Sequence, residues 1–252
     1  MHIDSQAGQY AFEAELLASS ILHVSNGIKP VSVKSSAVIG VGTMGVGIAV
    51  TFVDAGIPTK LLDASSNLLE RGVDRVRDHY RRCVERGRIS YSEMTERLSL
   101  ITGITNYDDL RDVDIVVEAV FEEMDMKKEV FSRLDQSCGP DTILATNTST
   151  LDIDEIAAAT TRPEHVVGMH FFSPAHVMRL VEIVRGRQTS LDTVATVLKL
   201  VQTIRKIGVV VGVCDGFVGN RMLHSFLREA FFLLGEGATP EQIDKVMVKF
   251  GF

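Results

Sequence analysis

A histidine and a glutamate stand on either side of a proline-containing turn in the segment GMHFFSPAHVMRLVE, residues 168–182. Apolar runs before and after the turn predict two strands that can bring His170 and Glu182 together. A histidine that titrates near neutral pH is the usual acceptor for a hydroxyl proton. A carboxylate on its other ring nitrogen fixes the tautomer and favours the imidazolium. The pair therefore predicts a general base with its orienting acid, and a buried structural histidine is the alternative.

A glycine-rich loop lies upstream of this pair. Gly40, Gly42 and Gly45 form the pattern Gly-x-Gly-x-x-Gly between a predicted strand and a predicted helix. In such a loop the glycines allow a tight turn, close approach of the backbone to a pyrophosphate, and close packing of helix on strand. Asp63, at the end of the next strand, would accept hydrogen bonds from ribose hydroxyls and repel a 2′-phosphate. The loop predicts NAD rather than NADP, and a structural glycine turn is the alternative.

Other polar residues follow predicted strand ends, where ligands of open α/β sheets bind. Glu122 and Lys127 follow one strand and could reach ribose or nicotinamide, although a solvated charged face is the alternative. Ser149 follows the next strand and could bond the substrate oxygen or the nicotinamide ribose, although a capping cluster is equally common there. Asn220, near a later helix start, can donate to a carbonyl oxygen if it faces the crevice, but such an asparagine is often only a cap.

The elements that must position these residues alternate along the chain. Short apolar runs typical of strands are followed by longer helical ones, which is the signature of a parallel sheet with crossover helices. The predicted strands cover residues 37–41, 59–63, 114–119, 142–146, 165–171, 179–184 and 208–212. The predicted helices cover residues 44–55, 65–87, 124–137, 152–159 and 191–206. The fold class is α/β, a Rossmann-type, doubly wound, mainly parallel sheet.

The two ends of the chain differ from this alternating middle. The first residues include four apolar side chains at helical spacing: Phe12, Leu16, Leu17 and Ile21. Near the other end we expect a long helix from about Phe217 to Gly235, then a second helix opened by a capping box from Thr239 to Gln242. Two helices are too few to close a core, so we expect the start of an all-α domain. The predicted parts are a helix and linker in 1–35, a nucleotide-binding domain in 36–212 and a partial helical domain in 213–252.

Composition and charge argue against several classes of protein. The net charge of −7 disfavours nucleic-acid binding, and no apolar run reaches the roughly 18 residues that span a bilayer. The N-terminal residues lack the pattern of a secretory signal, and three scattered cysteines suit a reducing compartment. Zinc binding by His165, His170 and His176 is disfavoured because neighbours five apart on a strand point to opposite faces. We expect no metal.

The motifs together resemble the 3-hydroxyacyl-CoA dehydrogenase family, and within it the dehydrogenase part of the peroxisomal bifunctional (multifunctional type 1) enzymes. The matching segments are GVGTMGVGIA, VDIVVEAVFEE, TNTSTLDIDEIA, GMHFFSPAHVMRLVEIV, KIGVVVGVCDGFVGNRML and FFLLGEGATPEQID. They extend from about Ser36 to Phe252, and their order makes the resemblance specific. It matches the family's catalytic pair to His170 and Glu182, and its substrate-contacting serine and asparagine to Ser149 and Asn220.

The resemblance also implies a cofactor site, a substrate and a location. The implied NAD contacts are Gly40, Gly42, Thr43, Met44, Gly45, Asp63, Ala119, Val120, Glu122, Lys127, Ser149 and Ser173. The implied reaction is NAD-dependent oxidation of a 3-hydroxyacyl-CoA thioester in fatty-acid β-oxidation, in an enzyme that forms a homodimer in part of the family. The implied location is the peroxisome, with the cytoplasm or the mitochondrion as alternatives. Two other functions stay open: another NAD-linked hydroxyacid dehydrogenase, and a non-catalytic NAD-binding or interaction module.

Overall fold

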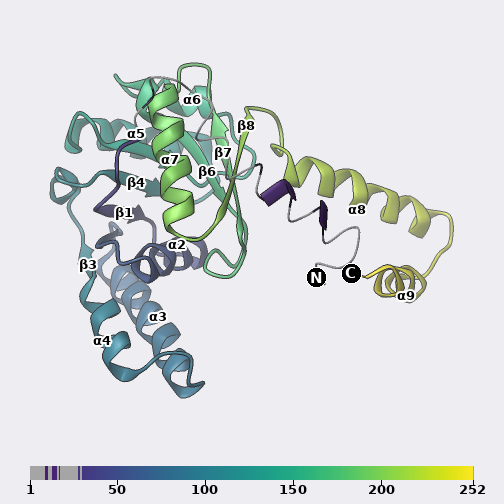
Figure 1. Ribbon diagram of the computed structural model, residues 1–252. Coiled ribbons are helices and arrows are strands. Elements are labelled where there is room, and N and C mark those ends of the chain that lie inside the picture. Colours follow the sequence, from purple (N-terminus) through teal and green to yellow (C-terminus); the bar gives the residue numbers. More distant parts are fainter. Residues whose placement is uncertain (1–8, 11–12, 16, 18–27, 29, 252) are drawn as a thin grey trace.

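The computed structural model describes residues 9–10, 13–15, 17, 28 and 30–251 (Figure 1). The amphipathic helix predicted near the N-terminus falls largely outside these residues, because of its four apolar positions only Leu17 is described.

Within the described residues, eight strands form one sheet in the order β3-β2-β1-β4-β5-β6-β7-β8. They are β1 Ser36–Ile39, β2 Thr59–Leu62, β3 Ile101–Ile104, β4 Ile115–Glu118, β5 Ile143–Thr146, β6 Val166–Phe171, β7 Leu180–Arg185 and β8 Ile207–Gly212. All neighbours are parallel except β6 and β7. The connection from β6 to β7 is too short for the crossover that parallel strands need, so the two strands form a hairpin. The predicted Rossmann-type sheet is confirmed.

The helices are α2 Thr43–Asp54, α3 Ser66–Glu85, α4 Tyr91–Ser99, α5 Met124–Ser137, α6 Ile153–Ala157, α7 Leu191–Thr203, α8 Gly219–Gly235 and α9 Pro240–Phe250. Two short 3₁₀ helices, η2 Tyr107–Leu110 and η3 Pro163–His165, lie in loops. The sequence did not predict β3 or α4. β3 is a four-residue edge strand with no buried residue, so it carries no clear apolar alternation. α4 did carry a signal that the prediction missed, because Ser90 and Glu93 form a capping box and Met94 and Leu98 pack on the core four residues apart.

The sheet separates two apolar cores, one on each face. Phe52 of α2 and Tyr80 of α3 pack in the first core, and Phe131 of α5 packs in the second. Successive residues of β4 alternate between them, because Val116 belongs to the second core and Val117 to the first. A sheet covered by helices on both faces leaves its strand ends as the place for a ligand.

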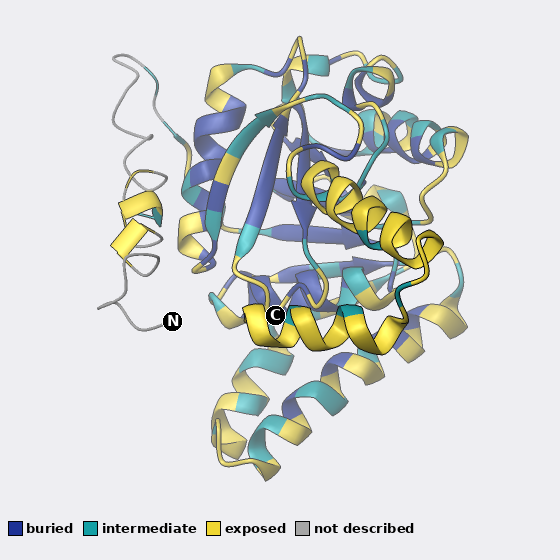
Figure 2. Ribbon diagram, turned by 90° about the vertical axis from the view of Figure 1, so that its right-hand side faces the viewer, coloured by how far each residue is buried: buried dark blue, intermediate teal, exposed yellow. Residues whose placement is uncertain are grey.

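The helices α8 and α9 extend away from the sheet (Figure 1), and neither contains a buried residue. Figure 2, seen from the side on which they project, shows both as mostly exposed ribbons in front of the buried sheet. The predicted capping box is present, because the Thr239 hydroxyl accepts from the backbone of Gln242 and the Gln242 side chain accepts from the backbone of Thr239. Among the described helices, none combines the length and the hydropathy needed to cross a membrane.

Candidate functional site

The glycine loop that follows β1 has the geometry of a nucleotide loop. Gly40 has a positive φ of 91°, and a Cβ there would lie 2.8 Å from the carbonyl oxygen of Ala119. A Cβ on Gly45 would lie only 1.9 Å from the carbonyl oxygen of Gly40. Gly42 differs, because nothing lies within 4 Å of the position a Cβ would take. Two glycines are therefore required by packing, and the third leaves open space beside the backbone.

The N-terminus of α2 is suited to an anion. Gly42 occupies the N-cap position without a capping side chain, and the first turn contains no acidic residue. The other long helix of this region, α3, has its first turn capped by the Ser65 hydroxyl, which accepts from the Leu68 amide. The uncapped amides and the positive dipole end of α2 favour a phosphate group.

A cavity of about 610 Å³ lies over this loop, at the carboxyl ends of the central strands. The residues that line it are Ile39, Gly40, Val41, Gly42, Thr43, Met44, Leu62, Asp63, Ala64, Leu68, Arg75, Tyr107, Ala119, Val120, Phe121, Met126, Glu129, Val130 and Arg133. Seven of the residues predicted as cofactor contacts are among them: Gly40, Gly42, Thr43, Met44, Asp63, Ala119 and Val120. The bare loop, the uncapped helix and the carboxylate of Asp63 fit the pyrophosphate and ribose of a dinucleotide.

Five predicted cofactor contacts do not line this cavity: Gly45, Glu122, Lys127, Ser149 and Ser173. Gly45 instead packs α2 against the loop. Sequence reasoning also missed several lining residues, notably Leu68 and Met126. Both are apolar side chains in the first turn of a helix that follows a strand, and they are 46% and 38% exposed respectively. An apolar residue at such a helix start is the sequence signal that could have indicated a place in the cavity wall.

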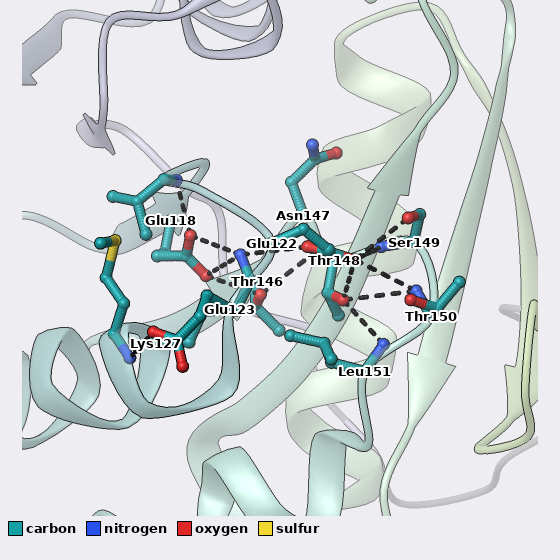
Figure 3. Close-up of polar contacts among 12 residues, drawn as sticks. Glu118, Glu122, Glu123, Lys127, Thr146, Asn147, Thr148, Ser149, Thr150 and Leu151 are labelled. Atoms are coloured by element: carbon teal, nitrogen blue, oxygen red, sulfur yellow. Dashed lines mark hydrogen bonds and ion pairs between the residues drawn. The ribbon is translucent and has the colours of Figure 1, made fainter.

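Lys127 does not belong to a solvated face. Its side chain is 1% exposed and its Nζ donates to both carboxylate oxygens of Glu118, at 2.7 and 3.0 Å (Figure 3). Glu118 is fully buried at the end of β4 and also accepts from the Thr146 hydroxyl and from the Val120 amide, each at 2.7 Å. This buried ion pair fixes the loop that carries Val120 into the cavity.

Glu122 connects that loop to the segment after β5. Its Oε1 accepts from the Thr148 hydroxyl at 2.6 Å, from the Ser149 amide at 2.7 Å and from the Ser149 hydroxyl at 3.0 Å (Figure 3). Burial raises the pKa of Glu122, but these hydrogen bonds and the charge of Lys127 outweigh it, so the pKa lies below its ordinary value. Ser149 is therefore held beside an ionised carboxylate. The helix that follows is capped by Asp152 and not by Ser149.

His170 and Glu182 are direct partners across the antiparallel β6–β7 hairpin. The Nδ1 of His170 lies 2.8 Å from Oε2 of Glu182, and the two residues are 6% and 2% exposed. The rings of Phe172 and Phe217 lie 4.5 and 5.8 Å from the imidazole, measured between centroids. Because Glu182 occupies Nδ1, Nε2 is the ring nitrogen left to exchange a proton with a ligand.

Two further predicted residues, Asn220 and Ser173, each adjoin in sequence a residue that contacts this pair. The second oxygen of Glu182, Oε1, accepts from the backbone amides of Val218 and Gly219, at 3.0 and 2.8 Å. Asn220 follows directly in the first turn of α8 and is half-buried. Ser173 is exposed in the loop after β6.

A hydrogen bond joins the serine segment to the histidine strand. Oδ1 of Asn147 accepts from the Phe171 amide at 2.9 Å, which connects the segment after β5 to the end of β6. Among the described residues, no group of three or more His, Cys, Asp or Glu side chains could hold a metal ion. His176 instead packs edge-on against His79, with ring centroids 4.7 Å apart.

Comparison with known proteins places this site in context. Residues 35–214 match the family model described as 3-hydroxyacyl-CoA dehydrogenase, NAD binding domain, and residues 216–252 match the model of its C-terminal domain. The first match confirms NAD as the cofactor predicted from the glycine loop and Asp63.

The chain is 46% identical over 252 residues to the peroxisomal bifunctional enzyme of Danio rerio, covering 98% of this chain and 34% of that protein. It thus spans about a third of the length of the curated relatives it matches. It is similar to the crystal structure of (S)-3-hydroxybutyryl-CoA dehydrogenase PaaH1 from Ralstonia eutropha (TM-score 0.83, 39% identity, 86% of this chain and 77% of that chain). It is also similar to the dehydrogenase part of multifunctional enzyme 1 from C. elegans (TM-score 0.72, 34% identity, 94% and 57%).

Proposed function

Because the chain belongs to the 3-hydroxyacyl-CoA dehydrogenase family, we propose that it oxidises the 3-hydroxyl group of an acyl-CoA thioester to a ketone, with NAD as the acceptor. The observation that carries the proposal is the buried His170–Glu182 pair, attached to a domain whose cavity fits a dinucleotide. A histidine with one nitrogen held by a carboxylate and the other open is suited to remove a hydroxyl proton.

When bound, NAD supplies a nicotinamide ring that accepts a hydride. The residues that would hold it are the Gly40–Gly45 loop with the first amides of α2, for the pyrophosphate, and Asp63, for the adenosine ribose. Glu122 and Ser149, at the neighbouring strand ends, would complete the site near the reacting carbon. Lys127 would contribute through its ion pair with Glu118.

The chain's own residues then account for the proton. Nε2 of His170 takes the proton of the substrate hydroxyl, and Glu182 stabilises the imidazolium that forms. Ser149 and Asn220 would position the substrate oxygen. General base catalysis of this kind is typically worth about 10²–10⁴-fold in rate.

We also propose which parts of the chain bind the cofactor and the substrate, and where in the cell the reaction takes place. Residues 36–212 would bind NAD, and residues 213–252 would form part of the substrate-binding helical domain. The relatives are named as peroxisomal bifunctional enzymes and as fatty-acid β-oxidation multifunctional proteins, which supports a role in β-oxidation and a peroxisomal location.

The test is NADH oxidation with acetoacetyl-CoA, the reverse reaction, together with calorimetric NAD binding. Wild-type protein should do both, and His170→Gln should lose turnover by about 10²-fold or more while NAD binding survives. His165→Gln, at the end of η3 and one residue before β6, is the matched control and should keep activity. NAD binding without reduction in the wild type would instead identify a non-catalytic NAD-binding module, and an active His170→Gln would exclude His170 as the base.

A further inference from the structure

The turn between β8 and α8 has an unusual backbone. Phe217 adopts a left-handed conformation, with φ 46°, although it is not a glycine, and its side chain is fully buried. Such a conformation costs free energy in a bulky residue and persists only where the surroundings enforce it. Here the Phe217 amide donates to the carbonyl of Cys214 at 3.0 Å, and the Arg221 amide donates to that of Gly216 at 3.0 Å.

This turn directs two backbone amides at one carboxylate. The amides of Val218 and Gly219 donate to Oε1 of Glu182, while Oε2 of the same carboxylate faces Nδ1 of His170. α8 has no N-cap side chain of its own, because Val218 occupies that position. A carboxylate from β7 therefore binds the N-cap and N1 amides of α8, which precede the N2 and N3 amides that an N-cap side chain normally binds, and the positive end of the helix dipole favours its charge.

Gly219 is required for this arrangement to fit. A Cβ on Gly219 would lie 2.8 Å from Cζ of Phe172 and 3.7 Å from Oε1 of Glu182. The ring of Phe172 in turn packs on the imidazole of His170. A methyl group at this position overlaps the Phe172 ring and must displace that ring or the start of α8, whereas its 3.7 Å distance from Oε1 of Glu182 is an ordinary contact.

We propose that Gly219 is a positioning residue for the catalytic base. Its amide, with that of Val218, fixes the carboxylate of Glu182 on His170, so that the placement of α8 controls the pair. The inference rests on the proposed function for its consequence in catalysis, but the geometry it invokes exists in the protein without cofactor or substrate.

The test adds one methyl group with Gly219→Ala. Gly235→Ala is the matched control, because it makes the same change at the other end of α8, where nothing lies within 4 Å. The structural readout is the Nδ1–H proton resonance of His170 in cofactor-free protein, assigned by its loss in His170→Gln. Wild type and Gly235→Ala should show this resonance protected from exchange with water, and Gly219→Ala should lose it.

The kinetic readout is kcat with acetoacetyl-CoA. Gly219→Ala should lower kcat by about tenfold or more, which is the effect of losing one charge-assisted hydrogen bond. The affinity for NAD should stay unchanged. In a Phe172→Ala background the added methyl group has room, so Gly219→Ala should there change little. A retained resonance in Gly219→Ala, or an equal loss in Gly235→Ala, overturns the proposal. If the wild type shows the resonance but never turns over, and Gly219→Ala loses the resonance, this inference stands and the proposed function is refuted.

Discussion

Removing the charge of Lys127 should destabilise the protein far more than removing a surface charge. In Lys127→Met a side chain of similar length replaces the ammonium group, and the fully buried carboxylate of Glu118 keeps only its bonds to Thr146 and Val120. Breaking a buried ion pair from one side typically costs about 3–5 kcal/mol. For a domain of this size that cost lowers Tm by about 6 °C or more.

The assay is urea unfolding followed by circular dichroism, with thermal scans beside it. Lys128→Met is the matched control, because Lys128 pairs with Glu155 on the surface and its loss should cost about 1 kcal/mol or less. The double variant Glu118→Gln/Lys127→Met removes both charges of this buried pair and should recover much of the stability. If Lys127→Met were no less stable than Lys128→Met, the reasoning from the buried pair would be refuted.

The same variants test whether Lys127 contributes to cofactor binding. Val120 lines the cavity and its amide is held by Glu118, so the single variant should also weaken NAD binding. A double variant that regains both stability and NAD affinity would show that Lys127 acts through Glu118. Regained stability without NAD affinity would mean that Lys127 acts on NAD by another route, either by direct contact or through its 3.4 Å ion pair with Glu122.

Three more predictions concern the cofactor half. Gly45→Ala should abolish NAD binding, measured by calorimetry, because its Cβ would lie 1.9 Å from the carbonyl oxygen of Gly40. Gly56→Ala would not be a usable control, because the positive φ of Gly56 strains any other residue there. Asp63→Asn should weaken NAD binding and narrow the preference for NAD over NADP, which the ratio of the two dissociation constants measures. For Glu122 the folded pKa is lowered, so its contribution to stability is fully present above the ordinary value of 4.5 and disappears as pH falls through the lower folded value. The Tm difference between wild type and Glu122→Gln should therefore be constant near neutral pH and vanish in acid, and a difference that grows in acid would contradict this sign.

Patterns with a physical period could be predicted from the sequence, and partnerships between distant side chains could not. The strands and crossover helices follow from apolar runs, and the pairing of His170 with Glu182 follows from two strands around a short turn. The burial of Lys127 was not predictable, because a lysine on a charged segment is normally solvated and its partner, Glu118, lies on another element. The hydrogen bonds from the amides at the start of α8 to the carboxylate of Glu182 could not be predicted either, because backbone donors are not indicated by residue type.

The hairpin origin of the His170–Glu182 pair has a consequence for the order of folding. The two residues are joined by the short loop between β6 and β7, whereas β1 meets β4 only by closing the chain from Ser36 to Ile115. The entropic cost of loop closure rises with loop length, and contacts of short sequence separation form faster. The His170–Glu182 pair can thus assemble from local contacts, whereas the cavity over the glycine loop forms only after the long-range pairing at the centre of the sheet.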